Sequence, residues 1–241
     1  MKEILERLKN DEDYYGEYGR QWMSNSNIGT LLSNPREFGS KPVEENTNLL
    51  LGRFFHVAML EPHKLGEFEI VDASSRNTKI YKEQSGDRFL LLQKEVDHLM
   101  YAINEMKGNK EMASQIFAKG NEYEVPNVSN FFGLDFKGKA DIVTKDKIID
   151  IKTTSNILAF PKSARSFNYD SQAFIYSSMF GLPFEFFVID KNTRQMKIFQ
   201  CSEEFLERGM QKVARAVEVY NKFFGPKSTH DVTQYVSKEV L

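Results

Sequence analysis

The sequence predicts a single α/β domain with a helical elaboration at its N-terminus. From residue 92 onward, the segments follow the order helix, three strands, helix, two strands, helix. Before residue 92 the pattern is helical or irregular, and no internal repeat or low-complexity tract interrupts the chain. A chain of 241 residues is long enough to bury the core that such a domain needs.

The N-terminal part, residues 1–50, is expected to form a partly helical arm of the same domain. The run SNSNIGTLLSNPREFGSKPVEENTN is rich in residues that favour turns and helix caps, and a short helix within it should end before Pro35. The next segment, 49–60, reads as a buried helix that stops at Glu61-Pro62. Residues 66–91 alternate only weakly and include a polar stretch that is expected to form a mobile loop.

The second half of the chain carries the clearer signals. Apolar residues at helical spacing predict a helix over 92–118. Alternation predicts strands at 121–128, 131–143, 147–152, 184–190 and 195–201, with turns at Ser129-Asn130, Lys145-Asp146 and Lys191-Asn192-Thr193. Helices are expected at 168–180, closed by Gly181, and at 203–224, capped by Ser202. The predicted core is therefore 51–225, followed by a C-terminal tail, 226–241.

Composition narrows the class of protein. Net charge is −2, so no overall positive charge indicates a nucleic-acid-coating protein or binding to an anionic membrane. The single cysteine, Cys201, excludes a disulfide framework, a thiolate zinc site and a four-cysteine iron–sulfur cluster. The N-terminus is charged, and no window approaches the roughly 18 apolar residues of a membrane span, so a soluble cytoplasmic protein is expected.

The stretch FKGKADIVTKDKIIDIKTT places charges at the end of an apolar strand. Asp150 and Lys152 are two residues apart and should project to the same face, with Asp141 on the preceding strand. Unpaired buried charges are costly, so these side chains either reach solvent at the end of the strand or share a function. Carboxylate oxygens are the ligands that Mg²⁺ prefers, and a nearby ammonium can stabilise charge in a transition state. The set suits phosphodiester hydrolysis.

The motif by itself is weak. Asp-x-Lys is expected about once by chance in a chain of this length, and Asp135-Phe136-Lys137 is a second copy near a turn. The alternative for Asp141, Asp150 and Lys152 is an ion-pair cluster at the edge of a sheet.

Two further features accompany the motif. His56 lies inside an otherwise apolar helix, where it is either a core residue or a metal ligand. Gln172 and Tyr176 are four residues apart and share one face of a predicted helix.

In chain order, GRFFHVAMLEP, GLDFKGKADIVTKDKIIDIKTT and YDSQAFIYSSMFG resemble the PD-(D/E)xK nuclease superfamily. More narrowly, they are similar to the RecE (exonuclease VIII-type) and RecB-type branch found in phages and prophages. The resemblance covers about residues 24–224 and implies a restriction-endonuclease-like core, a mixed central sheet flanked by helices.

The resemblance also implies roles for individual residues. A metal site would be formed by His56, Asp141, Asp150 and the main-chain carbonyl of Ile151, while Lys152 would position the attacking water. Gln172 and Tyr176 would support the site or the DNA backbone. A glutamate on the strand before Asp141 is also implied; Glu122 is preferred over Glu124, the second candidate. The iron–sulfur branch of the family is not expected, because Cys201 is the one cysteine.

The implied activity is Mg²⁺-dependent (Mn²⁺ as substitute) 5′→3′ exonuclease action on duplex DNA ends, leaving 3′ overhangs for a single-strand annealing protein in phage recombination. Relatives form rings, in which a few inward basic residues would make a positive channel despite the net charge. The candidates are Arg53, Lys137, Lys139, Lys162 and Arg165. The alternatives are an endonuclease or flap nuclease with the same site, and a non-catalytic protein that binds DNA ends.

Overall fold

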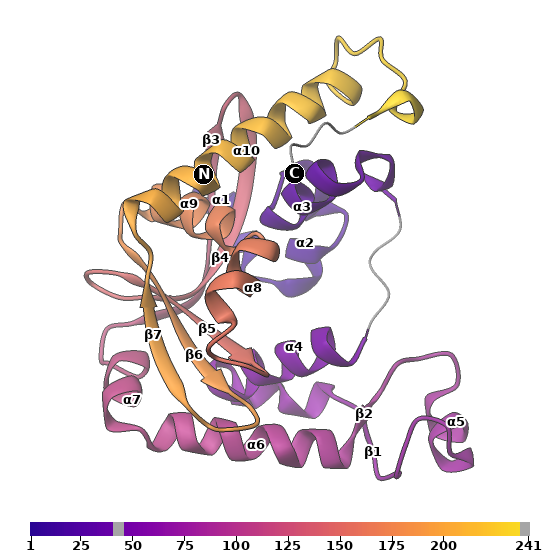
Figure 1. Cartoon of the computed structure of the whole chain (residues 1–241), viewed down its shortest axis with the longest axis vertical. Helices are drawn as coiled ribbons and strands as arrows, with labels where there is room; N and C mark the ends of the chain where they lie inside the picture. The colour runs from indigo at the N-terminus through magenta and orange to yellow at the C-terminus, as the bar shows by residue number, and fades with distance from the viewer. Residues whose placement is uncertain (41–45, 237–241) are drawn as a thin grey trace.

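A five-stranded mixed sheet forms the centre of the computed structural model, which describes residues 1–40 and 46–236 (Figure 1). Its strands, in spatial order, are β3 (Glu122–Phe131), β4 (Leu134–Val143), β5 (Ile148–Thr154), β6 (Phe184–Asp190) and β7 (Met196–Gln200). Strands β5 and β6 are parallel, and the other neighbours are antiparallel. The predicted fold class, a mixed sheet with flanking helices, is confirmed.

Helices cover both faces of the sheet. The α-helices of the described residues are α1 (Lys2–Leu8), α2 (Asp11–Tyr15), α3 (Asn25–Ser33), α4 (Thr47–Leu60), α5 (Lys79–Ser85), α6 (Gln93–Gly108), α7 (Lys110–Ile116), α8 (Phe160–Ser166), α9 (Tyr169–Phe180) and α10 (Glu203–Phe223). One hydrophobic cluster joins the sheet to α3, α8, α9 and α10, and a second joins it to α4, α6 and α7. In β5, Ile149 and Ile151 belong to the second cluster, so the alternating Asp150 and Lys152 point the other way.

Strands β4 and β5 separate almost as soon as they have paired. Their register contains two partner pairs, Ile142↔Ile149 and Val143↔Ile148. Beyond this point β4 stays with β3 and diverges from β5, which leaves a wedge between the two strands. Met23 pairs with the edge of β4 that β5 leaves free. Its N–H donates to the Asp135 carbonyl (2.9 Å), and its carbonyl accepts from the Lys137 N–H (2.8 Å).

The N-terminal arm therefore packs against the sheet. Within the predicted arm, residues 41–45 lie outside the described residues, as do residues 237–241 of the predicted tail. A short 3₁₀ turn of the tail, Val232–Gln234, contacts the arm, where the Arg36 guanidinium donates to the Thr233 carbonyl.

The turn between β3 and β4 differs from the prediction. It lies at Phe132-Gly133, both with positive φ (53° and 90°), and not at Ser129-Asn130. Such a turn fits the twist of a hairpin, and the Asn130 side chain accepts a hydrogen bond from the Gly133 N–H (3.1 Å). A phenylalanine at a left-handed position is uncommon, so the sequence pattern favoured a turn at Ser129-Asn130.

Three helical segments also differ from the prediction. The polar stretch in 66–91 contains α5, capped by Thr78 and flanked by the short parallel strands β1 (Ile70–Val71) and β2 (Leu91–Leu92). The helix predicted over 92–118 is two helices, because the Asn109 side chain caps α7 by accepting from the Met112 N–H (3.0 Å). Helix α8 was not predicted. No helix within residues 1–40 or 46–236 is long and apolar enough to cross a membrane.

Gly138 is a position at which the fold requires the absence of a side chain. A Cβ there would lie 2.5 Å from Cε1 of Tyr176 and 3.2 Å from Sδ of Met179. The Tyr176 ring is thereby pressed against the backbone of β4.

We expect Gly138→Ala to lower the free energy of unfolding by about 1–3 kcal/mol, because the ring of Tyr176 must move. Urea unfolding followed by circular dichroism measures the change. Gly52→Ala is the matched control: apart from its chain neighbours and its own helix backbone, no atom lies within 4 Å of its added Cβ, and alanine is favoured in a helix by about 1 kcal/mol. Equal stability of the Gly138→Ala variant and the wild type would contradict this packing.

Candidate functional site

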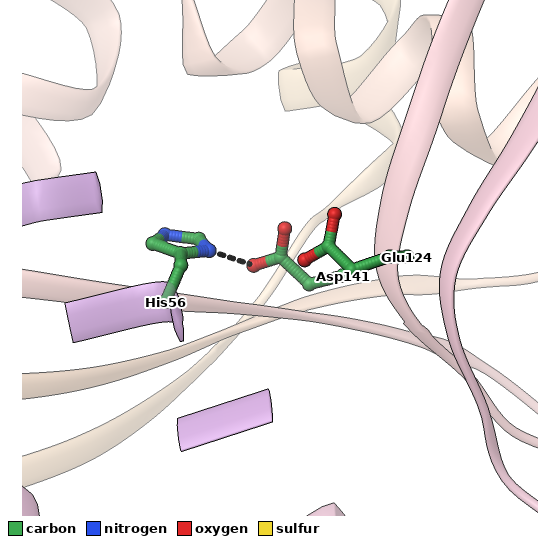
Figure 2. Close-up of side chains that lie close together, drawn as sticks. All are labelled: His56, Glu124 and Asp141. Carbon is green, nitrogen blue, oxygen red and sulfur yellow. Dashed lines mark ion pairs between the residues drawn. The ribbon is translucent and has the colours of Figure 1, made fainter. Parts of the chain in front are cut away.

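Charged side chains from four elements meet where β4 and β5 separate. His56 comes from α4, Glu124 from β3, Asp141 from β4, and Asp150 with Lys152 from β5. Figure 2 shows that the polar ends of His56, Glu124 and Asp141 converge. The two strand positions are set by the register, since Asp141 and Asp150 directly follow the Ile142↔Ile149 pair into the wedge.

Asp141 makes two contacts with one oxygen. Its Oδ2 accepts the main-chain N–H of Ile151 (2.9 Å), and lies 3.2 Å from Nδ1 of His56. Burial would raise the pKa of Asp141, but the neighbouring His56 and Lys152 and the Ile151 N–H together hold that pKa below its ordinary value. Burial would likewise lower the pKa of His56, and the Asp141 carboxylate reverses this and raises it. Asp141 is therefore an ionised carboxylate.

Asp150 is almost fully enclosed, with 1% of its surface exposed. Its Oδ1 accepts a hydrogen bond from Nε2 of Gln172 on α9 (2.7 Å), and its Oδ2 forms an ion pair with Lys152. Burial and the charge of Asp141 raise the pKa of Asp150 to about 6, although Lys152 and His56 oppose the shift.

Lys152 remains a cation in this site. Burial alone would lower the pKa of its ammonium, but Asp150 and Asp141 outweigh burial and raise that pKa. The Nζ atom lies 5.2 Å from the centroid of the Tyr169 ring, at the start of α9. The sequence analysis did not select Tyr169 as a site residue. The available signal was its position beside Asp170 at the start of a predicted helix.

Glu124 is the acidic residue that the structure brings beside Asp141. Its β3 neighbours Tyr123 and Val125 pair with Ile142 and Ala140, so Glu124 lies opposite Asp141 with a positive φ of 49°. Burial and the Asp141 charge raise the pKa of Glu124 to about 8, with His56 opposing. The preferred sequence candidate, Glu122, is instead exposed at the end of β3, paired with Val143.

The donor set fits a hard divalent cation. One ligand atom each from His56, Glu124 and Asp141 lie within 4.8 Å of one another. Burial and the charge of Asp141 raise the pKa values of two carboxyl groups of the site, Glu124 and Asp150, and a bound cation would oppose this shift. Of the expected ligands, Asp150 is not in this group, since its oxygens face Gln172 and Lys152. Ile151 contributes its N–H to Asp141.

The two helical candidates lie beside the site in different roles. Gln172 holds Asp150, as described above. Tyr176 is buried, and its hydroxyl oxygen accepts the main-chain N–H of Lys139 (3.2 Å). Helix α9 thus contacts both strands that border the wedge.

The basic candidates separate into two groups. Arg53, Lys162 and Arg165 are exposed. Lys137 and Lys139 are each only 7% exposed, because the N-terminal helix α2 and its tyrosines cover them. The sequence suggested channel-facing lysines here, and α2 could not be placed over them without the tertiary structure.

Residues 33–229 match the family model described as "PDDEXK-like domain of unknown function (DUF3799)". This span contains every residue of the site. The predicted resemblance to the PD-(D/E)xK superfamily is therefore confirmed. A comparison with curated proteins finds no match.

Several solved structures are similar to this chain, and two of them are exonucleases by description. The first is a protein of Eubacterium rectale, described as a "Putative exonuclease", with 17% identity, a TM-score of 0.68 and coverage of 96% of this chain and 95% of that chain. At this identity the likeness shows the fold. The second is a phage-related exonuclease from Haemophilus somnus 129PT, with 11% identity, a TM-score of 0.36 and coverage of 83% and 93%. So low a TM-score carries no argument.

We expect Glu124→Gln to weaken binding of Mg²⁺ or Mn²⁺ at least tenfold, because it removes a charged ligand while keeping the side-chain shape. Isothermal titration calorimetry measures the affinity. The matched control, Glu122→Gln, removes the same charge two residues away on the exposed end of the strand. A larger loss in Glu122→Gln would show that the sequence preference was right and the assignment to Glu124 wrong.

The raised pKa values also predict a pH effect on the metal-free protein. Glu124 and Asp150 bind protons more tightly when folded, so the stability they contribute is present below their unfolded pKa values near 4 and is lost as pH rises toward about 8 and about 6, respectively. The melting temperature in EDTA should fall from pH 5 to pH 8, and divalent cation should restore it at pH 8.

In Glu124→Gln, which has no proton to lose, the decline between pH 6 and 8 should be shallower. The same slope in this variant and in the wild type would mean that Glu124 does not titrate in that range.

Proposed function

The chain belongs to the PDDEXK-like family DUF3799, and from that premise we propose that it is a metal-dependent exodeoxyribonuclease acting on the ends of linear duplex DNA. The observation that carries the proposal is the convergence of His56, Glu124 and Asp141 beside the Asp150–Lys152 ion pair. The raised pKa values of Glu124 and Asp150 beside this group favour a functional site over an ion-pair cluster formed only for stability.

The cation is proposed to be Mg²⁺, with Mn²⁺ as a substitute. Bound at this site, it would act as a Lewis acid toward the scissile phosphate and the attacking water. Asp141 provides an ionised oxygen ligand, oriented by the Ile151 N–H. Nδ1 of His56 lies 3.2 Å from the same oxygen and helps to fix its direction.

Lys152 is proposed to stabilise the negative charge that develops on the phosphate and to orient the attacking water. Its ammonium stays protonated at neutral pH, and the Tyr169 ring limits its movement. Nε2 of Gln172 donates to Oδ1 of Asp150, and this bond keeps Oδ2 of Asp150 directed toward Lys152. These contacts keep Lys152 close to the candidate ligands His56, Glu124 and Asp141 and do not use their ligand atoms.

We further propose 5′→3′ polarity, with a 3′ overhang as the product for a single-strand annealing protein in phage-type recombination. The support is the ordered set of segments around His56, Asp141, Asp150 and Gln172, which is similar to the RecE and RecB-type branch. Assembly as a ring of copies is proposed on the same ground. Arg53, Lys162 and Arg165 are exposed and are candidates to face the DNA.

Lys152→Ala should slow cleavage by about 10²–10³-fold, because it removes a charge that acts in the transition state. A linear duplex labelled separately at its 5′ and 3′ ends is incubated with Mg²⁺, Mn²⁺, Ca²⁺ or EDTA. Early release of the 5′ label, with long 3′-ended strands and activity only with Mg²⁺ or Mn²⁺, is expected. The matched control is Lys119→Ala, an exposed lysine after α7 with no assigned role, which should cleave within a few-fold of the wild type.

Cutting of closed circular DNA would replace the exonuclease by an endonuclease. Retained binding to DNA ends without cleavage under any metal would indicate a non-catalytic end-binding protein. Activity of Lys152→Ala close to that of the wild type would contradict the assigned role of this lysine.

A further inference from the structure

Helix α2 covers a row of basic residues that leads to the metal site. Lys137, Lys139 and Asp141 occupy alternate positions of β4, so their side chains point to the same side of the strand. The ring of Tyr14 lies over both lysines, with its centroid 4.3 Å from Nζ of Lys137 and 4.7 Å from Nζ of Lys139. These lysines are buried by a five-residue helix that belongs to the N-terminal arm.

Asp11, the first residue of α2, bridges two cations. Its Oδ1 lies 2.6 Å from Nζ of Lys139, and its Oδ2 lies 2.9 Å from Nζ of Lys64. Lys139 precedes Asp141 by two residues, and Lys64 follows the helix that carries His56. Lys139 therefore lies on the strand that supplies Asp141, and Lys64 lies on the 3₁₀ segment just after the helix that supplies His56.

The three lysines of this covered region, Lys64, Lys137 and Lys139, share two carboxylate partners. Asp11 contacts Lys64 and Lys139, and Glu61 contacts Lys64 (2.7 Å). Lys137 donates to the Tyr14 carbonyl, and burial together with Lys139 and Arg20 lowers the pKa of Lys137 to about 8. The row can therefore accept a further anion.

We propose that Lys64 and Lys139 form a subsite for a backbone phosphate of DNA, and that Asp11 occupies this subsite as an internal competitor until DNA displaces it. A carboxylate presents two oxygens to the two ammonium groups, as a phosphodiester presents two non-bridging oxygens. Lysines that neutralise phosphates supply much of the affinity of DNA-binding proteins. The inference rests on the proposed function, since it names a DNA contact of the same site.

Relative exposure indicates which partner can leave. The Asp11 side chain is 45% exposed, whereas that of Lys139 is 4% exposed. The carboxylate lies on the solvent side of the ion pair, and α2 is short, so Asp11 can be replaced without unpacking the sheet. Lys139 is held in place by β4 itself.

The test compares two variants that remove one negative charge from the same helical turn. Asp11→Asn removes the carboxylate that Lys64 and Lys139 share, whereas Asp13→Asn breaks the pair with Arg7 (2.9 Å). Each is combined with Lys152→Ala to prevent cleavage, and binding of a fluorescent 20-base-pair duplex is measured by anisotropy with Ca²⁺ at several salt concentrations. Asp11→Asn should bind about three to ten times more tightly than Asp13→Asn.

A third variant tests whether the gain depends on the subsite. Lys64→Gln should weaken binding and lower the salt dependence by about one counterion, and Asp11→Asn added to it should recover little. Equal affinities of the Asp11→Asn and Asp13→Asn variants would overturn the subsite while leaving the nuclease proposal intact. Absence of DNA binding in all variants would overturn both.

Inorganic phosphate serves as the second probe, to separate free phosphate from DNA. Its effect on the melting temperature of Asp11→Asn is compared with that on Asp13→Asn. Selective stabilisation of Asp11→Asn by phosphate, together with tighter DNA binding, supports the proposal. Selective stabilisation without tighter DNA binding would overturn it in favour of a free-phosphate site.

Discussion

The separation of β4 from β5 after two residue pairs is the constraint on which the site depends. Where the ladder stops, the Ile151 N–H needs another acceptor, because an unpaired buried donor is costly. The Asp141 side chain supplies that acceptor. The Asp141 carboxylate that accepts the Ile151 N–H is thus also a member of the candidate metal group, and the backbone fixes its direction.

Around this point the protein concentrates more negative than positive charge. Three carboxyl groups, on Glu124, Asp141 and Asp150, face His56 and Lys152. The balance is uneven: His56 and the Ile151 N–H favour ionised Asp141, while the charge of Asp141 makes ionisation of the other two harder. A bound cation would offset this excess of negative charge, which favours a functional site over a structural ion pair.

The arm is an integral part of this arrangement. Met23 completes the edge of β4 that β5 leaves free, and α2 covers the lysines that precede Asp141. On the other side, α9 reaches β5 through Gln172 and β4 through Tyr176, which rests against Gly138. The arm and α9 therefore hold β4, and α9 also holds β5, so the ligands can stay rigid although the strands do not pair there.

The sequence by itself determined the order of the five strands of the sheet and the positions of α9 and α10, and it placed Asp141, Asp150 and Lys152 on adjacent strands. Alternation placed Asp150 and Lys152 on one face of β5, and this local periodicity needs no knowledge of distant contacts. It could not choose between Glu122 and Glu124, since both share the same spacing, and the choice depends on the register of β3 with β4. The sequence also led us to expect that Lys137 and Lys139 would face a DNA channel. Only the tertiary structure places Tyr14 and Asp11 over them, because residues more than 120 positions apart meet through packing that no local pattern records.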